Sequence, residues 1–214
     1  MAAGPSGLLQ PSGGAARSAP SALLAWLKRE SIALFGVAGA ALTTLGQLAG
    51  TMPMVPAVRD TVNLWQRLTH DFWRPPAAAL GTSLHPHIVA SLTLAVFLLT
   101  MGIGARVSRR LSGRPPPQGS LSQRLGDESR ISLAIFAALC IIFLIGHDGE
   151  RLVVFGSEKL GGYAFALPAA AAYITGSVIA GQAFHARMLR LGIVVAVLIA
   201  GNAIALWAMG SGGG

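Results

Sequence analysis

LGIVVAVLIAGNAIALWAM, from Leu191 to Met209, contains no Asp, Glu, Lys or Arg. A helix that crosses the hydrocarbon core of a bilayer needs about 20 predominantly apolar residues, and about 17 to 25 are observed. The stretch meets this length, and its apolar residues do not alternate with polar ones as they do in a transmembrane β-strand. It therefore predicts a membrane-spanning helix.

Four more apolar stretches precede it in the chain. They lie at about 32–52, 88–105, 131–146 and 163–181, and the third is the shortest. Together with 191–209 they predict an all-α membrane protein with about five transmembrane helices, which form a single bundle over 21–209. The small, polar segment 1–20 is expected to be a disordered tail, and 210–214 a flexible C-terminal tail.

The composition agrees with a membrane protein. Of the 214 residues, 53% are hydrophobic and 11% are charged, and the mean hydropathy is +0.61. A soluble domain carries about 25% charged residues, which cover its surface in water. The net charge of +8 does not indicate nucleic acid, because the cations lie between apolar runs and not in aromatic-rich basic patches. The lipid bilayer is the expected partner.

The distribution of cations predicts the orientation. With five spans, the N-terminal tail and the second and fourth loops share one side, and they carry 11 of the 16 Lys and Arg residues. Cytoplasmic loops carry an excess of these residues. We therefore expect a cytoplasmic N-terminus and an external C-terminus. The Ala-, Gly- and Arg-rich composition favours a bacterial inner membrane.

The segment VRDTVNLWQRLTHDFWR, Val58 to Arg74, predicts an amphipathic helix between the first two spans. At 100° per residue, its apolar and Thr residues occupy one continuous half of the helix, and its polar and charged residues the other. Such a helix lies in the membrane interface. Trp65, Phe72 and Trp73 are expected to reach the headgroup zone, as is Trp26 ahead of the first span. Pro75 and Pro76 are expected to end the helix. It either links the spans or docks a partner.

Histidines form one candidate site. His85 and His87 begin the second span, while His147 and Asp148 end the third, so the predicted topology brings all four to the outer face, where His70 also lies. Imidazoles with a nearby carboxylate are ligands for zinc or another transition metal, and paired imidazoles can ligate haem. The alternative is that these residues are polar caps of span ends. His185 is excluded, because it falls in an expected cytoplasmic loop.

Few polar residues lie inside the predicted spans. Gln47 and Asn202 are uncharged, and they are expected either to bond to neighbouring helices or to line a polar path. No charged residue lies in the middle of a span, which argues against a proton relay or a coupled transporter. Small residues are spaced for close helix packing at Gly46/Gly50, Ser177/Gly181 and Gly192/Ala196/Ala200.

The chain carries no catalytic motif: it lacks HExxH, CxxC, GxSxG and a Walker loop. We therefore predict a non-enzymatic accessory or scaffold subunit that meets a membrane protein partner or a second copy of itself. A small transport or channel protein that uses Gln47 and Asn202 is the first alternative. A redox subunit that holds a metal or haem on the outer histidines is the second.

Overall fold

The computed structural model describes residues 19–81, 84–113, 129–145 and 163–211. These residues form six helices and no strand: α1 (Ala19–Leu48), α2 (Pro56–Ala79), α3 (Pro86–Leu111), α5 (Ser129–Ile145), α6 (Tyr163–Ala180) and α7 (Gln182–Ser211). The prediction of an all-helical fold is confirmed over the described residues.

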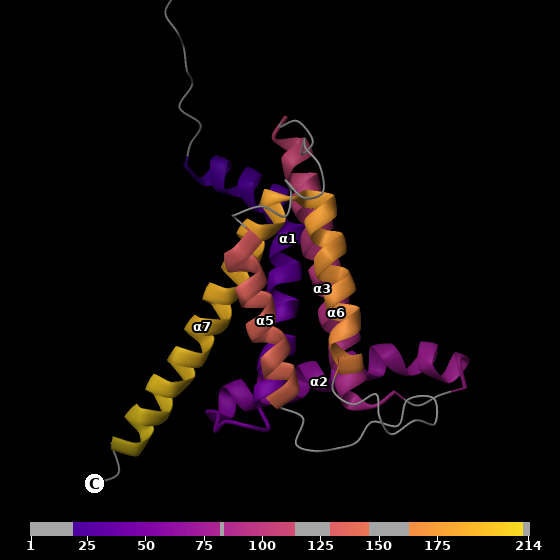
Figure 1. The fold of residues 1–214 in the computed structure, drawn as a ribbon. Coiled ribbons are helices and arrows are strands. Elements are labelled where there is room, and N and C mark those ends of the chain that lie inside the picture. Colours follow the sequence, from indigo (N-terminus) through magenta and orange to yellow (C-terminus); the bar gives the residue numbers. More distant parts are fainter. Residues whose placement is uncertain (1–18, 82–83, 114–128, 146–162, 212–214) are drawn as a thin grey trace, which may run out of the picture.

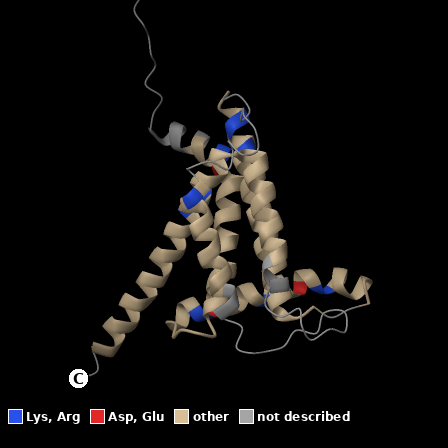
Figure 2. Ribbon diagram, viewed as in Figure 1, with Lys and Arg blue, Asp and Glu red and all other residues tan. Residues whose placement is uncertain are grey.

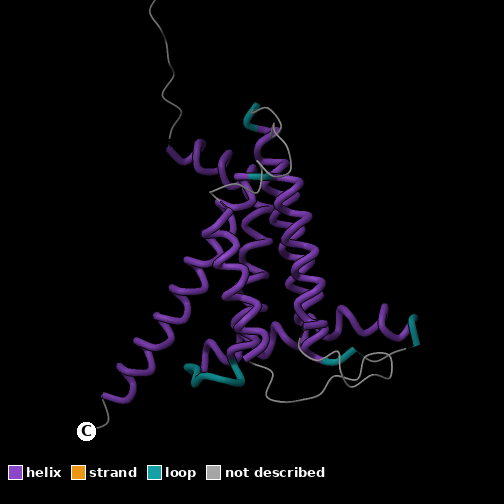
Figure 3. The backbone as a smooth tube through the Cα atoms, in the orientation of Figure 1, coloured by secondary structure: helices purple, strands orange, loops and turns teal. Residues whose placement is uncertain are grey.

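Five of these helices run roughly along one axis, and α2 lies across one end of them (Figure 1). Successive helices of the bundle run in opposite directions, so α1 ends and α3 begins beside α2, while α3 ends and α7 begins at the far end. The tube in Figure 3 shows the same arrangement of helices and short loops. The last helix, α7, ends at Ser211 at the end of the molecule that carries α2 (Figure 1).

Three helices are long and apolar enough to cross a membrane: Trp26–Leu48 within α1, Pro86–Leu111 and Gln182–Ser211. The apolar parts of α5 and α6, Ser129–Ile142 and Leu167–Ala180, are shorter. Three candidate spans among the described helices indicate a membrane protein.

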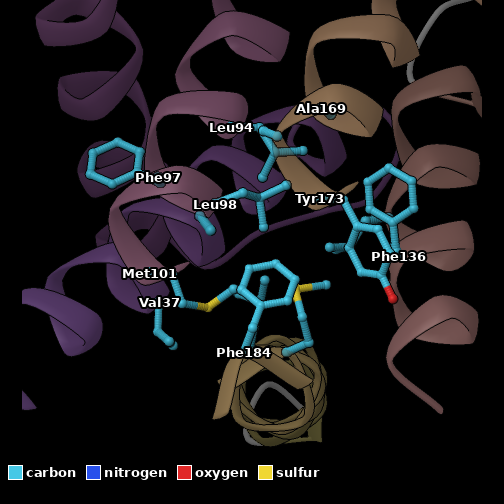
Figure 4. Close-up of a cluster of buried hydrophobic side chains, with 14 of the residues drawn as sticks. Val37, Leu94, Phe97, Leu98, Met101, Phe136, Ala169, Tyr173 and Phe184 are labelled. Carbon is cyan, nitrogen blue, oxygen red and sulfur yellow. The ribbon is translucent and has the colours of Figure 1, made fainter. Parts of the chain in front are cut away.

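The core is centred on α3 and on the first turns of α7. Phe184 of α7 is fully buried between Met101 and Leu98 of α3 and Tyr173 of α6 (Figure 4). The rings of Tyr173 and Phe136 stack with their centroids 4.6 Å apart, which joins α5 to α6. Large side chains from α1, α3, α5, α6 and α7 thus meet in one cluster.

Glycines set the closest helix approaches. A Cβ on Gly104 of α3 would lie 2.8 Å from the Ala33 Cα of α1, and one on Gly102 would lie 2.9 Å from the Gly176 Cα of α6. The sequence spacing predicted close packing at Gly46 and Gly50, but the close contacts occur at other glycines. Gly46 faces the Gln66 side chain, and Gly50 has open space around it.

Two predicted boundaries are wrong. The expected loop 182–190 is helical, because Phe184, Met188, Leu191 and Val195 recur at helical spacing and are all buried. Only Gly181, with φ of 54°, separates α6 from α7. At the other end of the chain, the residues ahead of the first expected span (32–52) are also helical, because α1 begins at Ala19. Residues 1–18 and 212–214 of the two expected tails lie outside the described residues.

The amphipathic helix is longer than predicted. It begins at Pro56 and continues through Pro75 and Pro76 to Ala79. Two prolines remove the backbone donors that would bond to the carbonyls of Asp71 and Phe72. Both of these residues are exposed, so water can hydrate the carbonyls and the helix can continue.

Candidate functional site

An open cleft of about 960 Å³ lies where α2 crosses α1 and α3. The last turns of α1 and the first turn of α3 form one wall, and the middle of α2 forms the other. Its polar lining comes from all three helices: Thr43, Gln47, Asn63, Gln66, Arg67, Thr69, His70, Asp71 and His87. The sequence predicts His70 and His87 at one membrane face and Gln47 inside the first span. The structure brings all three to this cleft.

Side-chain hydrogen bonds hold α2 against the bundle. The indole N–H of Trp65 donates to Thr43 Oγ1 of α1 (3.1 Å), and that of Trp73 donates to Thr93 Oγ1 of α3 (2.9 Å). The Gln66 amide donates to the Gly46 carbonyl (2.9 Å). Val62 is buried beside Leu45 and Met54. The helix is therefore fixed along most of its length and is not a loose linker.

The apolar half of α2 is divided between two directions. Val58, Val62, Trp65, Thr69 and Trp73 turn toward the bundle and are buried or half-buried. Leu64, Leu68 and Phe72 are exposed, and Phe72 is 68% accessible. Of the residues predicted for the headgroup zone, Phe72 therefore points outward and both tryptophans of α2 bond to the bundle. Trp26 is exposed in α1, at the end of the molecule opposite to α2.

The structure joins two of the predicted metal ligands. His85 caps the N-terminus of α3, where its Nδ1 accepts from the His87 backbone N–H (3.5 Å), and the two rings stack with centroids 5.2 Å apart. His87 Nδ1 also hydrogen-bonds to Gln47 Oε1 (3.1 Å). Among the described residues, no three His, Cys, Asp or Glu side chains form a metal-binding group. His147 and Asp148 lie outside the described residues, and the metal or haem site stays a prediction.

Asn202 occupies a different place from Gln47. It is buried where α7 meets the turn between α1 and α2, its Oδ1 accepts from the Val55 backbone N–H (2.9 Å), and its Nδ2 donates to the Pro53 carbonyl (3.0 Å). Both polar atoms of its side chain thus cap one turn.

A buried ion pair lies at the other end of the bundle. Glu30 of α1 pairs with Arg187 of α7, and its second carboxylate oxygen accepts from Ser108 Oγ of α3 (2.5 Å). Arg190 is more exposed, with its Nη1 3.9 Å from Glu30. The sequence did not predict this pair, because Glu30 lies ahead of the first expected span and Arg187 lies in an expected loop.

His185 is also buried at this end, and its assignment to a loop was wrong. Its Nδ1 hydrogen-bonds to Ser132 Oγ of α5 (3.0 Å), which in turn bonds to the Tyr173 hydroxyl of α6 (2.9 Å). The helical spacing of Phe184, Met188 and Leu191 was the signal that could have placed His185 and Arg187 on a packed helix.

Basic residues gather at the end that holds this ion pair (Figure 2). They lie near the ends of α1, α3, α5 and α7: Lys28, Arg29, Arg106, Arg109, Arg110, Arg130, Arg187 and Arg190. Among the described residues, the cations of the opposite end are Arg59, Arg67 and Arg74, which are all on α2.

Comparisons with protein-family models, with curated proteins and with solved structures find no match to this chain.

Proposed function

We propose that this chain is a five-span membrane protein that works as a non-enzymatic accessory subunit and offers α7 to a membrane-embedded partner. The observation that carries the proposal is the uncovered length of α7. Only 17% of its most apolar 18 residues are buried within the fold, against 56% for α1 and 61% for α3. Its second half slopes away from α5 (Figure 1), and Asn202 still bonds it to the turn between α1 and α2.

The count of five spans is supported by direction and by length. The five bundle helices alternate in direction, and α5 and α6 have 17 and 18 residues over their whole length, close to the lower limit of about 17 for a spanning helix. The basic end of Figure 2 supports a cytoplasmic location for the ends of α3 and α6. A bacterial inner membrane fits this orientation.

Exposed residues on α7 suit a helical partner. Val197 and Ile204 are exposed large apolar side chains, and Ala200 and Gly201 beside them are exposed and small. Small residues let helix backbones approach closely in a bilayer, where helix association depends on packing. The partner is either another membrane protein or a second copy of this chain.

Polar side chains support a scaffold more than a transport role. Asn202 caps a turn, Thr43 accepts from Trp65, and Gln47 bonds to His87. These are bonds between elements of the fold, and such bonds hold helices in place.

In-cell crosslinking tests the proposal. A photoreactive residue placed at Val197 or Ile204 should give a protein adduct of discrete mass, whereas one at Phe35, which is also exposed and apolar but lies on α1, should not. Two differently tagged copies of the chain distinguish a second copy from another partner. Lipid adducts alone at the α7 positions would contradict the proposal.

A further inference from the structure

The cleft between α1, α2 and α3 presents two opposite charges, Arg67 and Asp71 of α2. The two residues are one helical turn apart, which places their Cβ atoms about 5–6 Å from each other. Neither forms an ion pair or a hydrogen bond with another described residue. The order of the charges, cation before anion along the helix, is the less favourable one for pairing within a helix. Both charges are therefore available to a ligand.

The rest of the cleft combines polar walls with small apolar residues. Asn63 and His70 add hydrogen-bonding groups on α2, while the small residues Ala49 and Gly50 after α1 and Ala90 of α3 leave space. A neighbouring hollow of about 280 Å³ shares His70 and Val89 with the cleft. Its other lining is Arg74 and four mostly apolar residues: Trp73, Ala77, Ala78 and Leu84. The polar cleft thus adjoins a smaller, more apolar hollow.

We propose that the cleft binds a zwitterionic group of the phosphoethanolamine type, with its phosphate on Arg67 and its ammonium on Asp71. A guanidinium binds phosphate oxygens through two parallel N–H donors, and a carboxylate accepts from a primary ammonium. The two ligand charges are separated by two carbon atoms, which suits side chains one turn apart. A ligand with only negative charge would pair with Arg67 but would leave the Asp71 carboxylate without a partner.

This chemistry has two sources, a phosphatidylethanolamine headgroup of the bilayer or a free solute with the same groups. The cleft lies beside the end of α1 and the start of α3, which are two of the candidate membrane spans. It also adjoins the smaller hollow, so a lipid can bind with its headgroup in the cleft.

The test is native mass spectrometry of the full chain in detergent, with phosphatidylethanolamine, phosphatidylcholine and phosphatidylglycerol of equal acyl chains. We expect preferential retention of phosphatidylethanolamine, because phosphatidylglycerol has no ammonium and the quaternary ammonium of phosphatidylcholine has no N–H donor. Arg67→Gln and Asp71→Asn should each weaken binding about tenfold, the effect of losing one charge-assisted hydrogen bond.

Matched controls come from the same helix. Arg59 and Asp60 carry the same charges but do not line the cleft, so Arg59→Gln and Asp60→Asn should retain the lipid as the wild-type chain does. Added free phosphoethanolamine distinguishes the sources: displacement of the lipid indicates a soluble ligand, and continued retention indicates the headgroup. Equal retention of phosphatidylglycerol, or binding that Asp71→Asn leaves unchanged, would overturn the proposal.

Discussion

Glu30 is an acidic residue inside a candidate span, and its partners explain how it is tolerated. Its side chain is 6% accessible, and Arg187, Ser108 and the more distant Arg190 surround it. A buried charge is costly unless it is paired and hydrogen-bonded. Because these partners come from α3 and α7, the carboxylate ties α1 to two other helices.

Substitution of Glu30 tests this role. Glu30→Gln leaves the Arg187 guanidinium buried without its counter-ion, and breaking a buried pair in this way costs about 3–5 kcal/mol. We expect a clear fall in the thermal unfolding midpoint in detergent. Arg190→Gln is the control, because a half-exposed ion partner contributes about 0–1 kcal/mol. Equal effects of the two substitutions would show that Glu30 does not hold the helices together.

The glycine contacts give a second prediction at this scale. Gly104→Ala brings a methyl group against the α1 backbone at Ala33, where no flexible side chain can move aside. Overpacking of this kind costs about 1–3 kcal/mol. Gly201→Ala on α7 meets open space and should leave stability unchanged or slightly higher. Thermal unfolding in detergent compares the two, and a stable Gly104→Ala variant would mean that α1 and α3 are less closely packed.

At the scale of the element, α2 has three different sides. One packs on the bundle, one carries the charged residues, and one exposes Leu64, Leu68 and Phe72. The period of the sequence predicted the helix and its two halves. It could not predict that the apolar half is divided between the bundle and the exterior, because an apolar side chain can pack against either a helix or lipid. The Thr43 and Thr93 hydroxyl groups, which accept from the two indoles, lie on other helices and fix both tryptophans against the bundle.

An environment-sensitive fluorophore on α2 tests its position in the interface. In a chain with Cys140 replaced by Ala, a label at Phe72→Cys should show blue-shifted emission in liposomes, because this side is expected to enter the headgroup zone. A label at Asp60→Cys, on the charged side, should report water. Water-like emission from both positions would mean that α2 lies away from the bilayer.

The apolar stretches predicted where the helices of the bundle lie, but they did not predict the residues at which these helices begin and end. Long apolar runs identify a helix because the bilayer requires them. The start of α7 was not predicted, because His185, Arg187 and Arg190 lower the local hydropathy. Hydropathy does not show that His185 hydrogen-bonds to Ser132 and that Arg187 pairs with Glu30 in the folded chain. Likewise, the cleft depends on where α2 crosses α1 and α3, which is tertiary information that no single segment contains.

For the whole molecule, the uneven distribution of charge links fold to orientation. Basic residues near the ends of α1, α3, α5 and α7 gather at one end of the bundle (Figure 2), and they include buried and exposed arginines. The cleft lies at the opposite end, where α2 crosses α1 and α3. If the basic end is cytoplasmic, the cleft and the C-terminus face the outside of the cell membrane.

Reporter fusions test this orientation and the count of five spans together. A fluorescent protein that folds only in the cytoplasm should be active after Gly113, at the end of α3. Alkaline phosphatase, which needs the oxidising exterior to form its disulfides, should be active after Gly81, at the end of α2, and after Gly214. Three spans lie between Gly113 and the C-terminus in the five-span arrangement, so these two sites must report opposite sides. The same side for both would remove one span, and α5 or α6 would then have to lie within one leaflet or on the membrane surface.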